Sequence, residues 1–196
     1  MNVAGLLLAA GEGRRMGTPK ALLRDPAGVP YLDRTVGRLL DGGCTSVTVV
    51  LGASAGEARA LLDEAGWTGD DAVSVVEAAD WSTGMGASLC VGLSALSPSH
   101  AVAALVTLVD LPDVGDDVVG RLLSRTGTIG PDTLARAAYD GRPGHPVLLG
   151  RGHWAGVADT ARGDRGARDY LATHEHQEVE CGDLATGRDL DRPADL

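Results

Sequence analysis

Continuous apolar runs alternate with amphipathic stretches along the whole chain, and this alternation constrains the fold more than any other feature. Val3–Ala9 and Ala101–Val109 are continuous apolar runs, the second interrupted only by Thr107, which is typical of strands buried on both faces. Tyr31–Asp41 carries apolar residues at helical spacing between Pro30 and Gly42–Gly43, which predicts a helix. Strands and helices that alternate in this way predict an α/β fold, with a mostly parallel sheet covered by helices on both faces.

The remaining elements follow from the same patterns. We expect further strands at Ser46–Leu51, Val73–Glu77, Thr133–Tyr139, Pro146–Leu149 and Glu178–Cys181. We expect further helices at Gly56–Ala65, Gly86–Leu96 and Asp116–Arg125, and a helix with its loop at Gly163–His174. A length of 196 residues suits one domain spanning residues 1–196.

Charge and composition exclude several classes of function. The chain has 17 Lys and Arg against 27 Asp and Glu, a formal charge of −10, which argues against a nucleic-acid partner and an anionic membrane. Val3–Ala10 is too short to span a bilayer, and no basic residue precedes it as in a signal peptide. Cys44, Cys90 and Cys181 are widely spaced and form no CxxC motif, so neither a disulfide framework nor a zinc site is predicted. We therefore expect a cytoplasmic protein.

The segment after the first strand, Ala9–Lys20, combines glycines with basic residues. Successive backbone N–H groups in such a loop can hold phosphate oxygens, and Arg14, Arg15 and Lys20 add positive charge. The spacing fits neither a Walker A loop nor a GxGxxG dinucleotide motif, because Met16 stands where the third glycine would be. The loop therefore predicts a phosphate-binding site of another kind.

The chain resembles the nucleotidyltransferases with a MobA-like fold, and within them it is most similar to molybdenum-cofactor cytidylyltransferases. The first motif, Leu8–Ala9–Ala10–Gly11–x–Gly–Arg–Arg–Met–Gly–x–Pro–Lys, is specific, and the resemblance covers nearly the whole chain in the right order. The other matching segments are Ser82–Leu89, Asp110–Pro112, Gly144–Val147, Gly163–Arg168 and Asp191–Leu196. Ala10 stands where guanylate-transferring relatives usually carry Gly, as in pyrimidine-using members.

The resemblance implies an Mg²⁺-dependent enzyme with a Rossmann-like fold that transfers CMP from CTP to molybdopterin or a similar phosphorylated acceptor and releases pyrophosphate. A molybdoenzyme or its chaperone is a further implied partner. The implied catalytic residues are Arg15, Lys20 and Asp110. The implied nucleotide-binding residues are Leu8, Ala9, Ala10, Gly11, Gly13, Arg14, Lys20, Ser82, Gly84, Gly86 and Ser88. The implied acceptor-binding residues are His145, Asp164 and Arg168.

Carboxylates are the ligands that Mg²⁺ uses most in proteins, and one or two of them suffice. Asp110 ends a buried strand and is the first expected ligand. The resemblance points to Asp191 as the second, although Asp189 lies two residues away and could serve instead. Asp110 is followed by Leu111, where the family usually has Gln or Met.

Besides a catalytically silent nucleotide-binding or chaperone protein, against which the presence of Asp110 and Lys20 counts, two alternatives remain open from the sequence. One keeps the chemistry but changes the base, as in a guanylyltransferase, or the acceptor. The other is an NAD(P)H-dependent pigment oxidoreductase of the nicotine blue type on the same fold. The off-register glycines count against the second alternative, and so does the lack of a carboxylate in Leu51–Ser54, where a ribose partner would lie.

Overall fold

The computed structural model describes residues 2–192; the Pro193–Leu196 part of the last motif lies outside them. A seven-stranded sheet has the order β3-β2-β1-β4-β6-β5-β7. The strands are β1 (Val3–Ala9), β2 (Ser46–Leu51), β3 (Val73–Glu77), β4 (Ala103–Leu108), β5 (Leu134–Tyr139), β6 (Arg142–Gly150) and β7 (Gln177–Glu180). Only β6 runs antiparallel to its neighbours among these strands, so the mostly parallel α/β fold is confirmed.

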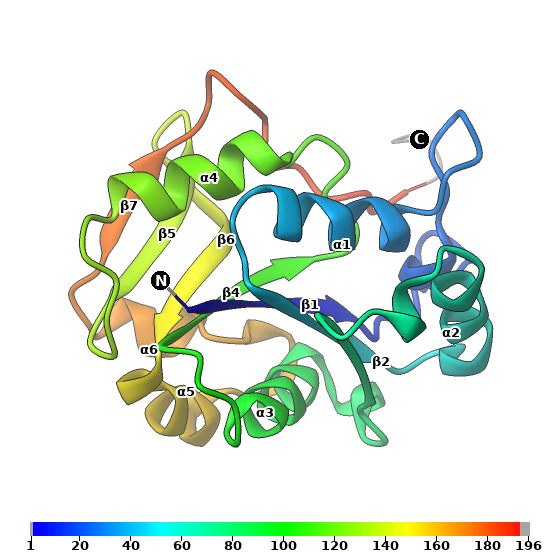
Figure 1. Cartoon of the computed structure of the whole chain (residues 1–196), viewed down its shortest axis with the longest axis horizontal. Helices are drawn as coiled ribbons and strands as arrows, with labels where there is room; N and C mark the ends of the chain where they lie inside the picture. Colours follow the sequence, from blue (N-terminus) through cyan, green and yellow to red (C-terminus); the bar gives the residue numbers. More distant parts are fainter. Residues whose placement is uncertain (1, 193–196) are drawn as a thin grey trace.

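Helices cover both faces of the sheet (Figure 1). On one face lie α1 (Tyr31–Asp41) and α4 (Asp116–Arg125), with α2 (Ala55–Glu64) at the β2 side. On the other lie α3 (Met85–Leu96), α5 (Trp154–Thr160) and α6 (Arg168–Ala172). In the described part of the chain, no helix is both long and apolar enough to cross a membrane.

Two apolar cores form because β1 and β4 are buried on both faces. Leu7 and Leu105 pack on the α1 and α4 side, whereas Leu6 and Ala104 pack on the α3 and α5 side. The continuous apolar composition of these strands is therefore what a central position in a two-faced sheet requires. It also means that the polar segments following β1 and β4 emerge together at one edge of the sheet.

Three expectations need correction. The second strand of the hairpin begins at Arg142 rather than Pro146, because the chain turns at Asp140–Gly141, where both residues have positive φ. The expected helix at Gly163–His174 is a short 3-10 turn (Gly163–Arg165) followed by α6. Helix α5, which opens with the buried Trp154, was not expected.

Candidate active site

The glycine-rich loop after β1 folds back on itself. The N–H groups of Met16 and Gly17 both donate to the carbonyl oxygen of Gly13 at 2.9 Å, and the N–H of Lys20 donates to Gly11 at 3.1 Å. Within the described residues, the backbone N–H groups of Gly11–Arg15 donate no hydrogen bond. The loop thus presents consecutive donors, which is the arrangement that binds phosphate oxygens.

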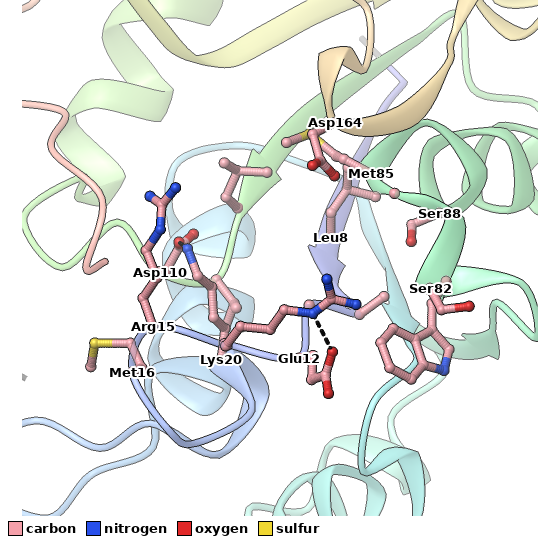
Figure 2. Close-up of a pocket in the computed structure, with 18 of the residues that line it drawn as sticks. Leu8, Glu12, Arg15, Met16, Lys20, Ser82, Met85, Ser88, Asp110 and Asp164 are labelled. Carbon is pink, nitrogen blue, oxygen red and sulfur yellow. Dashed lines mark hydrogen bonds and ion pairs between the residues drawn. The ribbon is translucent and has the colours of Figure 1, made fainter. Parts of the chain in front are cut away.

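Lys20 connects this loop to the end of β4. Its ammonium group forms an ion pair with Asp110 and lies 3.3 Å from Oδ1 of Asp191. Arg15 donates to the other oxygen of Asp191 at 3.1 Å. The C-terminal segment is held at this place because the N–H of Leu190, a buried residue, donates to the carbonyl oxygen of Asp110 at 2.9 Å. Figure 2 shows Lys20 and Arg15 close to Asp110 on one side of the pocket.

Burial and charge act in opposite directions on the pair formed by Lys20 and Asp110. Burial raises the pKa of Asp110, and the positive charge of Lys20 offsets part of that rise. Burial lowers the pKa of Lys20, but the charges and hydrogen bonds of Asp110 and Asp191 outweigh it, so the pKa ends above its usual value. Lys20 is therefore a cation at neutral pH, and it occupies the space between two carboxylates.

These groups line a cavity of about 460 Å³, which is large enough for a nucleotide-sized ligand. The opposite wall comes from the start of α3 and the turn before it, and Figure 2 shows Ser82 and Ser88 there. Gly84 has a φ of +121°, and a Cβ on it would lie 2.4 Å from the backbone carbon of Gly163. This close approach brings Asp164 to the rim of the same cavity.

The cations of the cavity are paired with carboxylates, so the positive charge that the loop contributes is balanced within the cavity. Arg14 pairs with Glu12 at 2.8 Å, while Arg15 and Lys20 pair with Asp191 and Asp110. Among the described lining residues, three cations face four carboxylates, the fourth being Asp164. A polyphosphate that arrived alone would therefore meet no excess of positive charge. A divalent cation that took over the carboxylates would free the basic groups for it.

The structure brings most of the predicted site residues to this cavity. Those that line it are Leu8, Ala10, Gly11, Gly13, Arg14, Arg15, Lys20, Ser82, Gly84, Ser88, Asp110, Asp164 and Asp191. Ala9 does not, because its side chain is 1% exposed within the core on the α1 side. Gly86 packs tightly against the backbone of residues 161–162 instead. Asp189 is exposed and does not line the cavity, and the tail it belongs to is not a strand.

Sequence reasoning missed several lining residues. Glu12, Met16, Thr83, Met85 and Leu108 also face the cavity. Their signal was position alone, since each lies within or beside an expected motif or at the end of a strand. Two of the apolar members, Met85 and Leu108, look like ordinary core residues in the sequence.

His145 and Arg168 lie outside the lining of this cavity but close to each other. The half-buried His145 is on β6, and Arg168 begins α6. Burial, and then the charges of Arg136 and Arg168, lower the pKa of His145 to about 4. His145 is therefore a neutral imidazole at physiological pH.

The depressed pKa predicts a pH-dependent loss of stability. Between pH 6.5 and 4 the unfolded chain takes up a proton at this residue that the folded chain does not, so the free energy of unfolding falls as the pH falls. Relative to a His145→Asn variant, we expect wild type to lose about 2 kcal/mol between pH 7 and pH 4.5, allowing for partial exposure. Urea unfolding of both proteins at the two pH values measures this. An equal loss in both proteins would contradict the assignment.

The sequence of residues 5–179 matches the family described as MobA-like NTP transferase domain. The chain is 38% identical to "Nicotine blue oxidoreductase" of Paenarthrobacter nicotinovorans, covering 96% of this chain and 92% of that protein. It is 30% identical to "Molybdenum cofactor guanylyltransferase" of Rhodobacter capsulatus, covering 79% of this chain and 66% of that protein.

Solved structures share this fold. The crystal structure of Rv0371c from Mycobacterium tuberculosis is 26% identical with a TM-score of 0.77, covering 100% of this chain and 95% of that one. The manganese complex of the same protein is 25% identical with a TM-score of 0.73, covering 97% and 94%. The resemblance seen in the sequence motifs is thus confirmed at the level of the family: this chain belongs to the MobA-like NTP transferases.

Proposed function

We propose that this chain transfers CMP from CTP to molybdopterin or a similar phosphorylated acceptor, with Mg²⁺ as the metal. One observation carries the proposal: a loop of free N–H donors and a lysine meets two carboxylates across a single nucleotide-sized cavity. The acceptor phosphate would attack the α-phosphorus of CTP. A new P–O–P bond forms, the bond between the α- and β-phosphates breaks, and pyrophosphate leaves.

The carboxylates of Asp110 and Asp191 fit a divalent cation. Both carboxylates already contact one cation, the ammonium group of Lys20, so positive charge is stabilised at this position. In the described chain no three His, Cys, Asp or Glu side chains gather as a metal cluster, and Mg²⁺ needs only one or two carboxylates beside phosphate and water. When bound, Mg²⁺ would neutralise charge on the phosphates during transfer. A manganese complex of the M. tuberculosis relative supports divalent-metal binding in this fold.

The chain's own residues then perform the binding and charge stabilisation. Lys20 and Arg15 would bind phosphate oxygens of the nucleotide, while Asp110 and Asp191, the carboxylates with which they pair here, would hold the metal. The N–H groups of Gly11–Arg15 would hold the phosphate oxygens. A phosphate monoester is already anionic at neutral pH, so the acceptor needs no general base.

The choice of CTP is argued from Ala10. This residue lines the cavity, yet it is only 5% exposed, and a Cβ on neighbouring Gly52 would lie 2.7 Å from its methyl group. The methyl group is therefore fixed in position and takes space that a purine would need. Relatives named molybdenum cofactor guanylyltransferases make GTP the alternative donor.

A reductase is the second candidate, because a relative that is 38% identical over 96% of this chain is named nicotine blue oxidoreductase. One assay separates the candidates: the protein is incubated with Mg²⁺, molybdopterin and each NTP in turn, and pyrophosphate release is followed. Pyrophosphate release with CTP supports the proposal. Release with GTP alone would show that the enzyme transfers GMP instead. No release, together with oxidation of NADPH by a quinonoid pigment, establishes the reductase. A molybdoenzyme or its chaperone would receive the cytidylylated product.

Replacing Lys20 by Ala should weaken CTP binding by about 10- to 100-fold, because a charge-assisted contact to the phosphates is lost. The measurement is calorimetric titration of Mg²⁺ and a non-hydrolysable CTP analogue. Arg24→Ala is the matched control, since the Arg24 side chain binds the carbonyl oxygen of Gly28 at 2.8 Å and does not line the cavity. Equal affinity of the Lys20 variant and wild type would refute its role in binding.

A further inference from the structure

The C-terminal segment, residues 181–192, contains no helix or strand, so individual contacts decide where it lies. It runs from β7 past α4 to the active-site cavity (Figure 1). Midway along it, the N–H and the O–H of Thr186 both donate to Oδ2 of Asp113 at 2.6 Å. Further on, the N–H of Leu190 donates to the carbonyl oxygen of Asp110 at 2.9 Å. The loop between β4 and α4 therefore holds the segment at two points.

The Asp113 carboxylate forms hydrogen bonds with Thr186 and with no other group in the described chain. Its second oxygen, Oδ1, is buried without a partner. A buried acceptor of this kind costs free energy, so a carboxylate is not the most stable choice for the loop itself. The loop is already held by Arg38 of α1, which binds the carbonyl oxygens of Pro112 and Val114 at 3.1 Å each. The contact that Asp113 adds is the one with the C-terminal segment.

The residue after Thr186 shows that this contact belongs to one register of the segment. Gly187 has a φ of +63°, and a Cβ on it would lie 2.2 Å from Cε2 of the buried Tyr139. The backbone thus passes too close to the Tyr139 ring for any side chain. A slip by one residue would bring Thr186 or Arg188 against the ring. The Asp113 contact and the Tyr139 ring together allow one alignment of the segment with the loop.

This alignment decides which carboxylate reaches Lys20. Oδ1 of Asp191 lies 3.3 Å from the ammonium group, whereas Asp189 is exposed and outside the cavity lining. Consecutive Cα atoms are about 3.8 Å apart, so a slip by one residue would move Asp191 out of contact. Leu190 or Arg192 would take its place, and neither side chain can bind a cation.

We propose that Asp113 is a positioning residue of the active site: by binding Thr186, it fixes the register of the C-terminal segment and so places Asp191 beside Asp110 as the second carboxylate of the metal site. Asp113 does not line the cavity, so it acts through Asp191. For the metal, the inference rests on the proposed function. The register of the segment can be tested without any ligand.

The backbone N–H signal of Gly187 reports the register in the ligand-free, ¹⁵N-labelled protein, because the ring current of Tyr139 shifts it. In Asp113→Ala this signal should move toward its value in an unstructured peptide, while the signal of Gly5 within β1 stays in place. If Asp113 only added stability, the folded variant would keep both signals. An unchanged Gly187 signal in folded Asp113→Ala therefore overturns the proposal.

Binding of Mn²⁺ with a CTP analogue, followed by electron paramagnetic resonance, tests the effect on the metal. Asp113→Ala should weaken Mn²⁺ binding about 10- to 100-fold, as the loss of a group that orients a metal ligand usually does. Asp113→Asn keeps an acceptor oxygen for Thr186 and should remain within about threefold of wild type. An Asn variant as weak as the Ala variant would show that negative charge acts rather than position, which overturns the proposal.

Asp183→Asn is the matched control within the same segment. Its carboxylate pairs with Arg121 of α4, with Nη2 and Oδ2 2.9 Å apart, before the chain reaches Thr186. This variant should bind Mn²⁺ like wild type, and a loss equal to that of Asp113→Ala would overturn a specific role for Asp113. Failure of the proposed function looks different: wild type would bind Mn²⁺ no better than Asp110→Asn, and the Gly187 signal would still decide whether Asp113 sets the register.

Discussion

Asp110→Asn should reduce turnover by at least about 1,000-fold while leaving the folded protein at least as stable as wild type. The loss is expected because Asn keeps the shape but not the charge that would hold the metal at the end of β4. The stability follows from burial, which raises the pKa of Asp110 and so shows that its ionised form is disfavoured in the folded chain. A neutral amide avoids that cost, and Lys20 keeps Asp191 as a partner.

Pyrophosphate release measures the turnover, and thermal unfolding measures the stability. Binding of Mn²⁺ with a CTP analogue, followed by electron paramagnetic resonance, should weaken in parallel with the loss of turnover. Asp116→Asn is the control, because Asp116 is an exposed residue at the start of α4. Wild-type turnover in the Asp110 variant would remove the basis of the proposed mechanism, and a large drop in unfolding temperature would show that Asp110 is structural.

The sheet could be predicted from the sequence where burial alone decides the structure. The bounds expected for Val3–Ala9 and Ser46–Leu51 agree with those of β1 and β2, because an apolar strand has few alternatives in a parallel sheet. Those expected for Val73–Glu77 also agree with β3, an edge strand whose valines are half-buried. The start of β6 could not be predicted, since Arg142, Pro143 and Gly144 are not strand-forming residues. They extend only because the turn at Asp140–Gly141 and the partner strand β5 impose it.

Part of the candidate site could likewise be predicted from the sequence, and part could not. The glycine-rich loop and Asp110 could be placed together from the sequence, because both follow parallel strands that are neighbours in the sheet. The ion pairs that connect the basic groups of the loop to Asp191 could not be predicted, since Asp191 lies 171 residues from Lys20 in the chain.

Gly13→Ala should weaken CTP binding at least about 30-fold, or about 2 kcal/mol. Gly13 has a φ of +62°, and a Cβ on it would lie 2.0 Å from the carbonyl oxygen of Thr18, a separation that real Cβ atoms do not reach. The backbone that closes the loop must therefore move away. This displacement would disturb the N–H donors of Gly11–Arg15 and the position of Lys20, whose backbone nitrogen is 3.5 Å from the same point.

Gly17→Ala separates this clash from the cost of the backbone conformation. Gly17 lies in the same loop and has a similar φ of +71°, but a Cβ on it would meet nothing within 4 Å. Both variants carry the cost of placing a side chain at positive φ, about 1 to 2 kcal/mol, so the difference between them reports the clash alone. Calorimetric titration of the CTP analogue should give at least a tenfold weaker affinity for Gly13→Ala than for Gly17→Ala. If the two variants bind equally, the closed loop is not what holds the triphosphate, and the phosphate site lies elsewhere in the cavity.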